Sequence, residues 1–420
     1  MAPSDHCWES RTPSHSSCRR ARSRSSKPMA KRVWSAVVAG SEAMGGAEHR
    51  PRGLGSRHVR VLIFSSDIGE GHELPARVVC DGILARRPDA EVLVLDTMRA
   101  AGPVATLVVR RGAEVVLGRL GWLFDLQYWL IARFAPTRAL MRRLCALIAL
   151  PGLLRTVAAF APDVIVCTYP GANELLSDAR RRGRLAVPVV SAITDLAALQ
   201  YWAHAGCDLH LVVHPESAAE IRAIAGAAAR VVAVRGLTSP GFEAPVDPAG
   251  ARAALGLDGG APVVLVSGGG WGIGDLEGAV RAALAADPAA QVVALCGHNA
   301  PARTALQAAF AREPRVRVSG FTDRMDRHLA AADVLVHSTA GLTALEAMVC
   351  GARVISYGWG RGHVRLNNEA YARFGLADVV EGPAGLSAAI ARALLRPRSP
   401  DVGYARRPAA ADEILDLAGA

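Results

Sequence analysis

The sequence predicts an α/β fold with two similar halves, and three stretches carry this prediction. Residues 59–64 form an apolar run typical of a buried strand, and the turn Gly69-Glu70-Gly71-His72 and then a helical pattern follow it. Residues 262–266 form a second such run, which leads into the glycine-rich turn 267–274. The segment 331–368 reads strand, turn, helix, strand and polar loop. Both halves therefore place glycine turns at the carboxyl ends of strands, where open α/β sheets bind ligands.

The first half is expected to span residues 58–240. Its later strands are predicted where short runs rich in Val, Ile and Leu occur, at 92–95, 164–167 and 189–193.

His72 is the first candidate for catalysis in this half. Its glycine turn lets backbone N–H groups and one side chain approach a ligand closely. A His placed there can work as a base, because imidazole changes its charge near neutral pH. A Rossmann dinucleotide loop has three glycines and no His, whereas this turn has two glycines and a His. The alternative is that His72 caps a helix or binds phosphate through its N–H.

The second half is expected to span residues 250–395, after a linker at 236–249 that holds three prolines. Its strands are predicted from apolar runs at 263–266, 292–296, 316–318, 334–337 and 354–357. The remaining residues, 396–420, form a tail with a short helical pattern. We expect this last helix to cross back onto the first half, as it often does in two-domain proteins of this class.

The positive charge is concentrated at the N-terminus. The whole chain carries a formal charge of +10, of which residues 1–57 contribute +7. This segment is rich in Ser, Arg, Gly and Pro, which predicts a disordered basic tail. It faintly resembles a signal peptide, and a start codon placed too far upstream is the alternative. The rest of the chain is close to neutral, so nucleic acid is not an expected partner.

A basic and aromatic segment, residues 99–155, lies in the first half. It holds nine arginines against two acidic residues. Such a mixture suits a surface that lies on an anionic bilayer. The expected membrane contacts are Trp122, Trp129, Arg142 and Arg143. The alternative, which is compatible with the first, is a set of amphipathic helices that pack the domain and turn their arginines to water. No apolar run reaches the ~18–20 residues that span a membrane.

The cysteines and the acidic residues give no sign of a metal site. The eight cysteines form no Cys-x-x-Cys pair, and several sit inside apolar runs. This usage fits a reducing cytoplasm, with neither disulfides nor zinc. No Asp-x-Asp metal motif stands in a suitable loop, so we expect no metal and no cofactor.

In their order and spacing, the motifs resemble those of the monogalactosyldiacylglycerol synthase family. Processive diacylglycerol glucosyltransferases and the N-acetylglucosaminyltransferase of lipid II synthesis are near relatives of that family. The resemblance covers roughly residues 58–395. It rests on Gly-Glu-Gly-His at 69–72, Thr194-Asp195 with Trp202 downstream, residues 268–274, Cys296-Gly297-His298-Asn299, Gly320-Phe321-Thr322, and Gly341-Leu342-Thr343 followed by Glu346-Ala347. It implies a GT-B fold, in which an acceptor-binding and a UDP-sugar-binding Rossmann-like domain face a cleft.

The resemblance implies that His72 is the general base for an acceptor hydroxyl, which must lose its proton as it attacks the anomeric carbon. It places Thr194-Asp195 and Trp202 in the acceptor region. Asp195 is expected to orient His72 or to bind the acceptor, and the alternative is a helix N-cap, a common role of Asp. The expected acceptor is a diacylglycerol-like lipid. The protein is accordingly expected to be cytoplasmic and peripheral on the inner face of the cell membrane.

The resemblance assigns the donor site to the second half. Glycine turns let N–H groups converge on phosphate oxygens, and a helix N-terminus adds partial positive charge. The diphosphate of UDP is expected at Gly268, Gly269, Gly270 and Gly272, with Gly341 and Thr343 on its other side. Glu346 is expected to bind the ribose hydroxyls, and His363 and Asn367 to lie in the loop that contacts donor sugar and phosphate. The alternatives are a structural glycine hairpin and a surface or capping Glu346.

The expected activity is transfer of a hexose or N-acetylhexosamine from a UDP-sugar to a lipid hydroxyl, with inversion and without a metal. One alternative is a UDP-N-acetylglucosamine 2-epimerase-like enzyme, which shares the two-domain fold but needs carboxylates near the sugar and no lipid-facing patch. The other alternative is a catalytically silent UDP-binding partner subunit. Nucleotide binding without turnover would support it.

Overall fold

The structure is a computed structural model. It describes residues 58–66, 70–107, 134–244, 247–338, 341–358, 360 and 363–419, with the exception of the side chains of Glu70, Ala135 and His363. The predicted disordered tail, residues 1–57, lies outside the described residues, as do Trp122 and Trp129.

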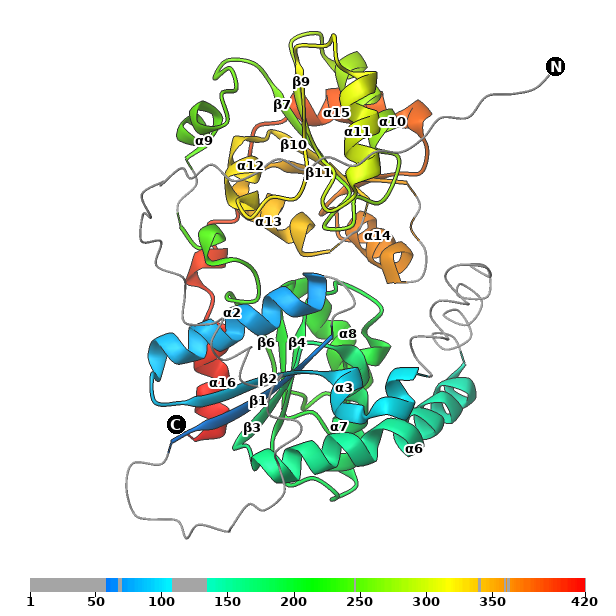
Figure 1. Cartoon of the computed structure of the whole chain (residues 1–420), viewed down its shortest axis with the longest axis vertical. Helices are drawn as coiled ribbons and strands as arrows, with labels where there is room; N and C mark the ends of the chain where they lie inside the picture. The colour runs from blue at the N-terminus through cyan, green and yellow to red at the C-terminus, as the bar shows by residue number, and fades with distance from the viewer. Residues whose placement is uncertain are drawn as a thin grey trace, which may run out of the picture. The chain divides into compact units, whose positions relative to one another are not determined.

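The first sheet has six parallel strands in the order β2-β1-β3-β4-β5-β6 (Figure 1). Its strands are β1 (Arg60–Ser65), β2 (Glu91–Asp96), β3 (Val164–Cys167), β4 (Val189–Ile193), β5 (Leu209–Val212) and β6 (Val231–Ala233). The register places Val61 of β1 opposite Val92 of β2 and Val164 of β3. The four strands predicted from apolar runs are confirmed, and β5 and β6 were not predicted.

The two faces of this sheet follow from alternation along β1, because successive side chains of a strand point to opposite faces. Val61 and Ile63 pack with helix α2 (Glu70–Arg86) in one core cluster. Leu62 and Phe64 pack with α6 (Ala135–Phe160) and α7 (Pro170–Arg181) in another cluster. Two further helices of this part are α3 (Thr97–Ala101) and α8 (Ala218–Ala225). Parallel sheets are covered by helices on both faces in this way, and their strands are apolar throughout.

The second sheet also has six parallel strands, in the order β12-β11-β10-β7-β8-β9. Its strands are β7 (Val263–Ser267), β8 (Gln291–Leu295), β9 (Val316–Ser319), β10 (Val334–His337), β11 (Arg353–Tyr357) and β12 (Asp378–Val380). The helices around it are α9 (Pro248–Ala254), α10 (Leu276–Ala286), α11 (Ala300–Ala309), α12 (Met325–Ala331), α13 (Leu342–Cys350), α14 (His363–Arg373) and α15 (Pro383–Leu394). The predicted fold class, α/β with two parallel sheets, is confirmed.

The last helix, α16 (Ala410–Ala418), returns to the first sheet, as expected. The backbone of Ala410 donates to the carbonyl of Arg235 at 2.9 Å, just after β6. Arg86 at the end of α2 forms an ion pair with Asp412. Ile414 is fully buried in the same core cluster as Val61 and Ile63. Helix α16 thus completes the cover of the face that α2 begins (Figure 1).

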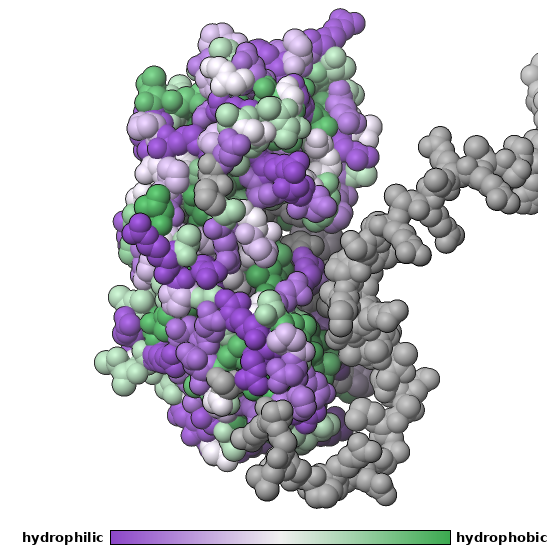
Figure 2. All heavy atoms as spheres, turned by 90° about the vertical axis from the view of Figure 1, so that its left-hand side faces the viewer, coloured by the Kyte–Doolittle hydropathy of each residue, from purple (hydrophilic) through white to green (hydrophobic). Residues whose placement is uncertain are grey.

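Helix α6 differs from the sequence-based expectation that no stretch could span a membrane. Its residues Pro136–Phe160 are long and apolar enough to do so by length and composition, with 22% of the most apolar window buried. The C-terminal turns nevertheless belong to the core, because Leu153 and Val157 pack beneath β1 and β3. The N-terminal turns expose Leu140, Leu144 and Leu147, the last at 75%. Figure 2 shows the side of the molecule that lies to the left in Figure 1, where hydrophilic and hydrophobic residues are interspersed.

Candidate active site

His72 lies in the first turn of α2, directly beyond the carboxyl end of β1. Its Nδ1 is 2.9 Å from the carbonyl oxygen of Thr168, which follows β3. A carbonyl oxygen only accepts hydrogen bonds, so Nδ1 carries the proton and donates it. In the neutral ring the lone pair is therefore on Nε2, because the partner of one ring nitrogen fixes the tautomer of the other. This is the protonation state that a general base needs.

The backbone of His72 is held as firmly as its ring. Its carbonyl oxygen accepts hydrogen bonds from the hydroxyls of Ser65 and Thr168, each at 3.0 Å. Both hydroxyls are buried at strand ends, Ser65 at the end of β1 and Thr168 just after β3. Three hydrogen bonds from two neighbouring strands thus fix the position of one side chain. Such pre-organisation is what a catalytic group requires.

Two aromatic rings flank the imidazole. The Tyr169 ring meets it edge-on with the centroids 5.4 Å apart, and the Trp202 ring lies at 6.0 Å. Burial raises the pKa of the Tyr169 phenol, which therefore stays neutral. Trp202 is only 1% exposed and forms a buried apolar wall beside His72. Its place in the acceptor region stays a prediction.

Asp195 lies beyond the end of β4. Among the hydrogen bonds of the described residues, it bonds to Trp202, whose ring contacts His72, and not to the imidazole itself. The Trp202 indole Nε1 donates to its Oδ2 at 2.8 Å. Its Oδ1 accepts from the side-chain Nδ2 of Asn367 at 3.0 Å. Asp195 is therefore a positioning residue for Trp202, and any influence on His72 acts through that ring. The expected direct orientation of His72 by Asp195 is not what the structure shows, and neither is the helix N-cap, because Ala198 precedes the 3-10 turn that follows.

Asn367 has a different environment from the one predicted. It is fully buried in α14, and its Oδ1 accepts from the backbone amides of Leu196 at 3.1 Å and Ala197 at 2.8 Å. With Nδ2 on Asp195, the amide bonds the loop after β4. Both ends of the side chain are thus bonded to the first half of the protein, and the predicted donor contact stays a prediction. Sequence reasoning missed this link, for which no local pattern exists.

The glycine-rich turn after β7 is tightly packed. Gly272 has a φ of 58°, and a Cβ at this position would collide with the carbonyl oxygen of Cys296. A Cβ on Gly268 would meet the backbone of Gly272 and Ile273. The amides of Gly272 and Ile273 donate to carbonyls of Gly269 and Gly268 within the turn. These glycines therefore have a structural reason to be glycine, and these two N–H groups are already used. The Gly269 amide also has a partner, the Ser267 hydroxyl at 3.2 Å. The diphosphate contact of Gly268, Gly269, Gly270 and Gly272 stays a prediction.

The helix after this turn, α10, does not offer the open positive end that was expected. Asp275 caps it, since its Oδ1 accepts from the amide of Gly278 at 2.8 Å, and its Oδ2 accepts from the Tyr357 hydroxyl at 2.7 Å. A carboxylate there opposes a phosphate. The sequence carried the signal for this cap, an Asp directly before a helical pattern.

Helix α13 is the better anion-binding end. It begins after β10 with Gly341 as N-cap and has no side-chain cap. Its first-turn amides, Thr343 included, therefore present the partial positive charge that attracts phosphate. The contact of Gly341 and Thr343 with the diphosphate remains a prediction that this geometry favours.

Glu346, one turn into the same helix, is 5% exposed, and the Thr238 hydroxyl donates a hydrogen bond to it. Burial raises the pKa of its carboxyl to about 7, against the smaller lowering effect of that hydrogen bond. The carboxylate thus faces the connection between the two sheets, and the alternative of a surface residue is wrong. Ribose binding by Glu346 stays a prediction. His363 begins α14, and its side chain lies outside the described residues.

Among the described residues, no group of three or more His, Cys, Asp or Glu side chains is placed to hold a metal ion. Arg142 and Arg143 both lie on α6. Arg142 lines a pocket, and Arg143 is exposed and outside that pocket. The two arginines that were predicted together as membrane contacts thus have different surroundings.

Comparison with known proteins gives sequence matches in both halves. Residues 79–238 match the family model of monogalactosyldiacylglycerol (MGDG) synthase, and residues 270–396 match that of group 1 glycosyl transferases. Monogalactosyldiacylglycerol synthase 1 of Arabidopsis thaliana is 27% identical over 72% of this chain and 58% of its own length. The processive diacylglycerol beta-glucosyltransferase of Bacillus pumilus is 22% identical over 76% of this chain and 83% of its own length. The chain thus spans less than two thirds of the plant relative.

Among solved structures, MurG of Acinetobacter baumannii matches with a TM-score of 0.53 and 17% identity, over 85% of this chain and 99% of that chain. The glycotransferase of kitacinnamycin matches with a TM-score of 0.50 and 16% identity, over 86% and 95%. At such identities the likeness concerns the fold alone. The two-domain GT-B fold and the resemblance to monogalactosyldiacylglycerol synthases and diacylglycerol glucosyltransferases are thereby confirmed.

Proposed function

We propose that this chain, a relative of the monogalactosyldiacylglycerol synthases, is a glycosyltransferase with a lipid acceptor. It transfers a hexose or N-acetylhexosamine from a UDP-sugar to the hydroxyl of a diacylglycerol-like lipid, with inversion and without a metal. The observation that supports this most is the hydrogen bond from His72 Nδ1 to the Thr168 carbonyl, at 2.9 Å. It orients the imidazole beyond the carboxyl end of β1 and, when the ring is neutral, leaves Nε2 as the basic nitrogen.

In the proposed reaction, His72 Nε2 takes the proton of the acceptor hydroxyl while the oxygen attacks the anomeric carbon. The hydrogen bond to Thr168 persists and strengthens, because the ring becomes an imidazolium and a charged donor bonds more strongly than a neutral one. The UDP leaves from the opposite side of the sugar, so the anomeric configuration inverts. The amides at the start of α13 suit the diphosphate, whose negative charge grows as the bond breaks.

The rings around His72 make its surroundings partly apolar. Tyr169 and Trp202 lie on two sides of the imidazole. Removing water there strengthens the electrostatic contacts of the reacting groups. Trp202 is kept in place through Asp195 and Asn367, which makes this wall depend on the contact between the two halves.

Helix α6 suits a peripheral membrane contact on the cytoplasmic face. Its N-terminal turns expose Leu140, Leu144 and Leu147, and Arg143 lies among them in the sequence. Exposed apolar side chains with arginines are typical of helices that lie in the interface of an anionic bilayer. The buried C-terminal turns anchor this helix in the domain, so we propose that α6 rests on the membrane rather than crossing it.

A product analysis tests the proposal. The purified full chain is incubated with a panel of UDP-sugars and with diacylglycerol in mixed vesicles, and the lipids are resolved by mass. A glycosylated diacylglycerol that forms equally with and without EDTA is the expected result. Conversion of UDP-N-acetylglucosamine without any acceptor would instead identify an epimerase. UDP binding by calorimetry with no product from any pair would identify a silent binding subunit.

A further inference from the structure

The linker between the two sheets places a hydroxyl group on the carboxyl of Glu346. Thr238, a few residues beyond β6, is fully buried, and its Oγ1 donates a hydrogen bond to Oε1 of Glu346 on α13. Among the hydrogen bonds of the described residues, the carboxyl has this partner alone, and its Oε2 accepts from none. The linker therefore holds one oxygen of Glu346 and leaves the other available.

The titratable groups near this carboxyl do not favour its charged form. Asp326 of α12 is negative and raises the pKa of Glu346 beyond the larger rise that burial causes. Cys350 lies one turn further along α13, and burial raises the pKa of its thiol to about 12. Burial also raises the pKa of the Tyr404 phenol, ahead of α16. Both groups are thus neutral at physiological pH, and the hydrogen bond from Thr238 is what opposes the rise in the pKa of Glu346.

Glu346 follows the predicted diphosphate contact of Thr343 by three positions on α13. Residues three apart lie on the same side of a helix, about one turn from each other, which is a separation that the ribose of a bound UDP can bridge. An ionised carboxylate only accepts hydrogen bonds, on both oxygens, whereas protonation turns one acceptor into a donor. The charged form is therefore the one that accepts from ribose and from Thr238 together.

We propose that Thr238 is a positioning residue for the donor, which prepares the Glu346 carboxylate for the hydroxyls of the ribose. This role rests on the proposed function, because its ligand is a UDP-sugar. With the Thr238 bond in place, the pKa of Glu346 is about 7. The carboxyl thus changes its charge near physiological pH, where a single hydrogen bond decides how much of it is charged. The linker thereby sets the pH range in which the donor binds.

Two substitutions of Thr238 separate its hydroxyl from its shape. Thr238→Val keeps the shape and removes the donor, and Thr238→Ser keeps the donor. The probe is UDP, titrated into the full chain by calorimetry between pH 6 and pH 9. Losing a hydrogen bond to a charged group corresponds to about one pKa unit. Thr238→Val is therefore expected to bind UDP about fivefold more weakly than wild type at pH 7 and within about twofold at pH 9. Thr238→Ser is expected to follow the wild type at every pH.

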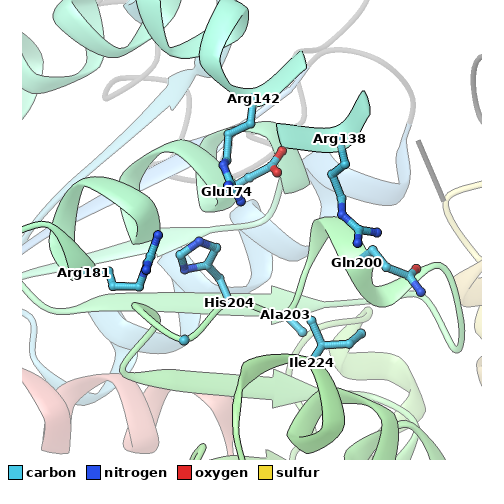
Figure 3. Close-up of a pocket in the computed structure, with 9 residues that line it drawn as sticks. Arg138, Arg142, Glu174, Arg181, Gln200, Ala203, His204 and Ile224 are labelled. Carbon is cyan, nitrogen blue, oxygen red and sulfur yellow. The ribbon is translucent and has the colours of Figure 1, made fainter. Parts of the chain in front are cut away.

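Two other groups that titrate near pH 7 are controlled in this comparison. The terminal phosphate of UDP titrates in the same range, but equally for every variant, so the ratio of two affinities removes its effect. In the protein, Glu174 of α7 lines a pocket with Arg138 and Arg142 of α6 (Figure 3). Burial raises the pKa of Glu174 to about 7 as well. Glu174→Gln is expected to leave the difference between wild type and Thr238→Val unchanged at each pH.

Unfolding without nucleotide tests the contact itself. Thr238→Val raises the pKa of Glu346 further, because the lost hydrogen bond favoured the charged form. The free energy of unfolding of this variant, taken relative to wild type, is therefore expected to fall more at pH 8 than at pH 5. In a Glu346→Gln background, which cannot ionise, the effect of Thr238→Val is expected to be the same at both pH values. A role in linker packing alone would give no such pH dependence in either background.

Equal UDP affinity of wild type and Thr238→Val at pH 7, a Thr238→Ser variant as weak as Thr238→Val, or a fivefold loss that persists at pH 9 would each overturn the role of Thr238. In these cases UDP still binds, so the proposed function stands. If the wild-type chain binds no UDP, the role of Thr238 and the UDP-sugar donor are both rejected. The two failures are thus distinguishable in the same titration.

Discussion

Asn367 donates a hydrogen bond from Nδ2 to Oδ1 of Asp195 at 3.0 Å, across 172 positions of the chain. The other end of the same amide accepts from the backbone of Leu196 and Ala197. One side chain of α14 therefore holds the loop that follows β4, and this loop leads to the Trp202 ring beside His72. The contact links a residue expected in the donor site to the candidate acceptor site.

Replacing Asn367 with Ala is expected to lower stability more than UDP affinity. The change leaves two buried amides without their acceptor, and each unsatisfied group typically costs about 1–3 kcal/mol. Urea unfolding of the full chain measures the free energy of unfolding, and calorimetry measures UDP binding. Glu369→Ala, two positions on in α14 and exposed, is the control and is expected to be nearly neutral. A variant of normal stability with weakened UDP binding would instead support the predicted donor role of Asn367.

The strands that border the site could be predicted because their buried residues form apolar runs in the sequence. Four residues in a row are apolar in β1 and in β7, and four of five are apolar in β4, as expected for parallel strands covered on both faces. Strands β6 (Val231–Ala233) and β12 (Asp378–Val380) are three residues long and only partly buried, so their local pattern is too weak to separate from a loop. In α6, arginines interrupt the apolar runs, and Pro151 lies inside the helix, so the sequence showed no apolar run of membrane-spanning length there.

Only those features of the site that depend on a single local motif could be predicted from the sequence. The position of His72 at the end of a strand follows from local pattern, whereas its tautomer depends on the Thr168 carbonyl, 96 residues away. The same holds for Glu346, whose partner Thr238 lies 108 residues earlier. Periodicity reports which face of an element is buried, but it carries no information on which distant polar group meets a buried one.

Glu346 makes stability depend on pH. Its buried carboxyl has a pKa raised to about 7, above the ~4.3 of an unfolded Glu, so the folded state binds the proton more tightly. The contribution to stability is fully present below pH ~4 and is lost as the pH rises through 7. Glu346→Gln cannot ionise, and it keeps an oxygen to accept from Thr238. The free energy of unfolding of the variant, taken relative to wild type, is expected to be higher at pH 8 than at pH 5 by on the order of 1–3 kcal/mol.

Thermal unfolding of wild type and variant at the two pH values measures this gain. Glu369→Gln, at an exposed position of α14, serves as the reference, and its difference from wild type is expected to be the same at both pH values. A Glu346→Gln variant that is equally destabilised at pH 5 and pH 8 would show that the carboxyl is charged throughout and that its environment is more polar than its burial indicates.

Gly272 tests the packing of the glycine-rich turn. At a φ of 58°, a side chain is strained, and its Cβ would overlap the Cys296 carbonyl oxygen. Gly272→Ala is expected to lower the free energy of unfolding by roughly 2–4 kcal/mol, because the strain and the displaced loop add. Gly259→Ala is the control, since nothing lies within 4 Å of its added Cβ. If both variants unfold at the wild-type urea concentration, the turn is looser than its geometry indicates.

The role of His72 is tested best by replacing it with Asn. The Asn side-chain amide can still donate to the Thr168 carbonyl, as Nδ1 does at 2.9 Å, but it has no basic nitrogen. Turnover of the UDP-sugar with diacylglycerol is expected to fall by about 10²–10⁴-fold, which is the usual contribution of a positioned base. The affinity for UDP is expected to stay within about twofold, because the predicted UDP contacts lie around the second sheet and none of them involves His72.

His328→Asn is the matched control for this experiment. The His328 ring also places Nδ1 at 2.9 Å from a backbone carbonyl, that of Arg324, but this hydrogen bond is exposed to solvent on α12. Its replacement should change neither turnover nor UDP affinity, since the same chemistry at a solvent-exposed place serves no substrate. Two results would reject the base. One is near-normal turnover in His72→Asn. The other is a loss of UDP affinity as large as the loss of rate, which would make His72 a contact of the diphosphate and direct the search for the base to Asp195.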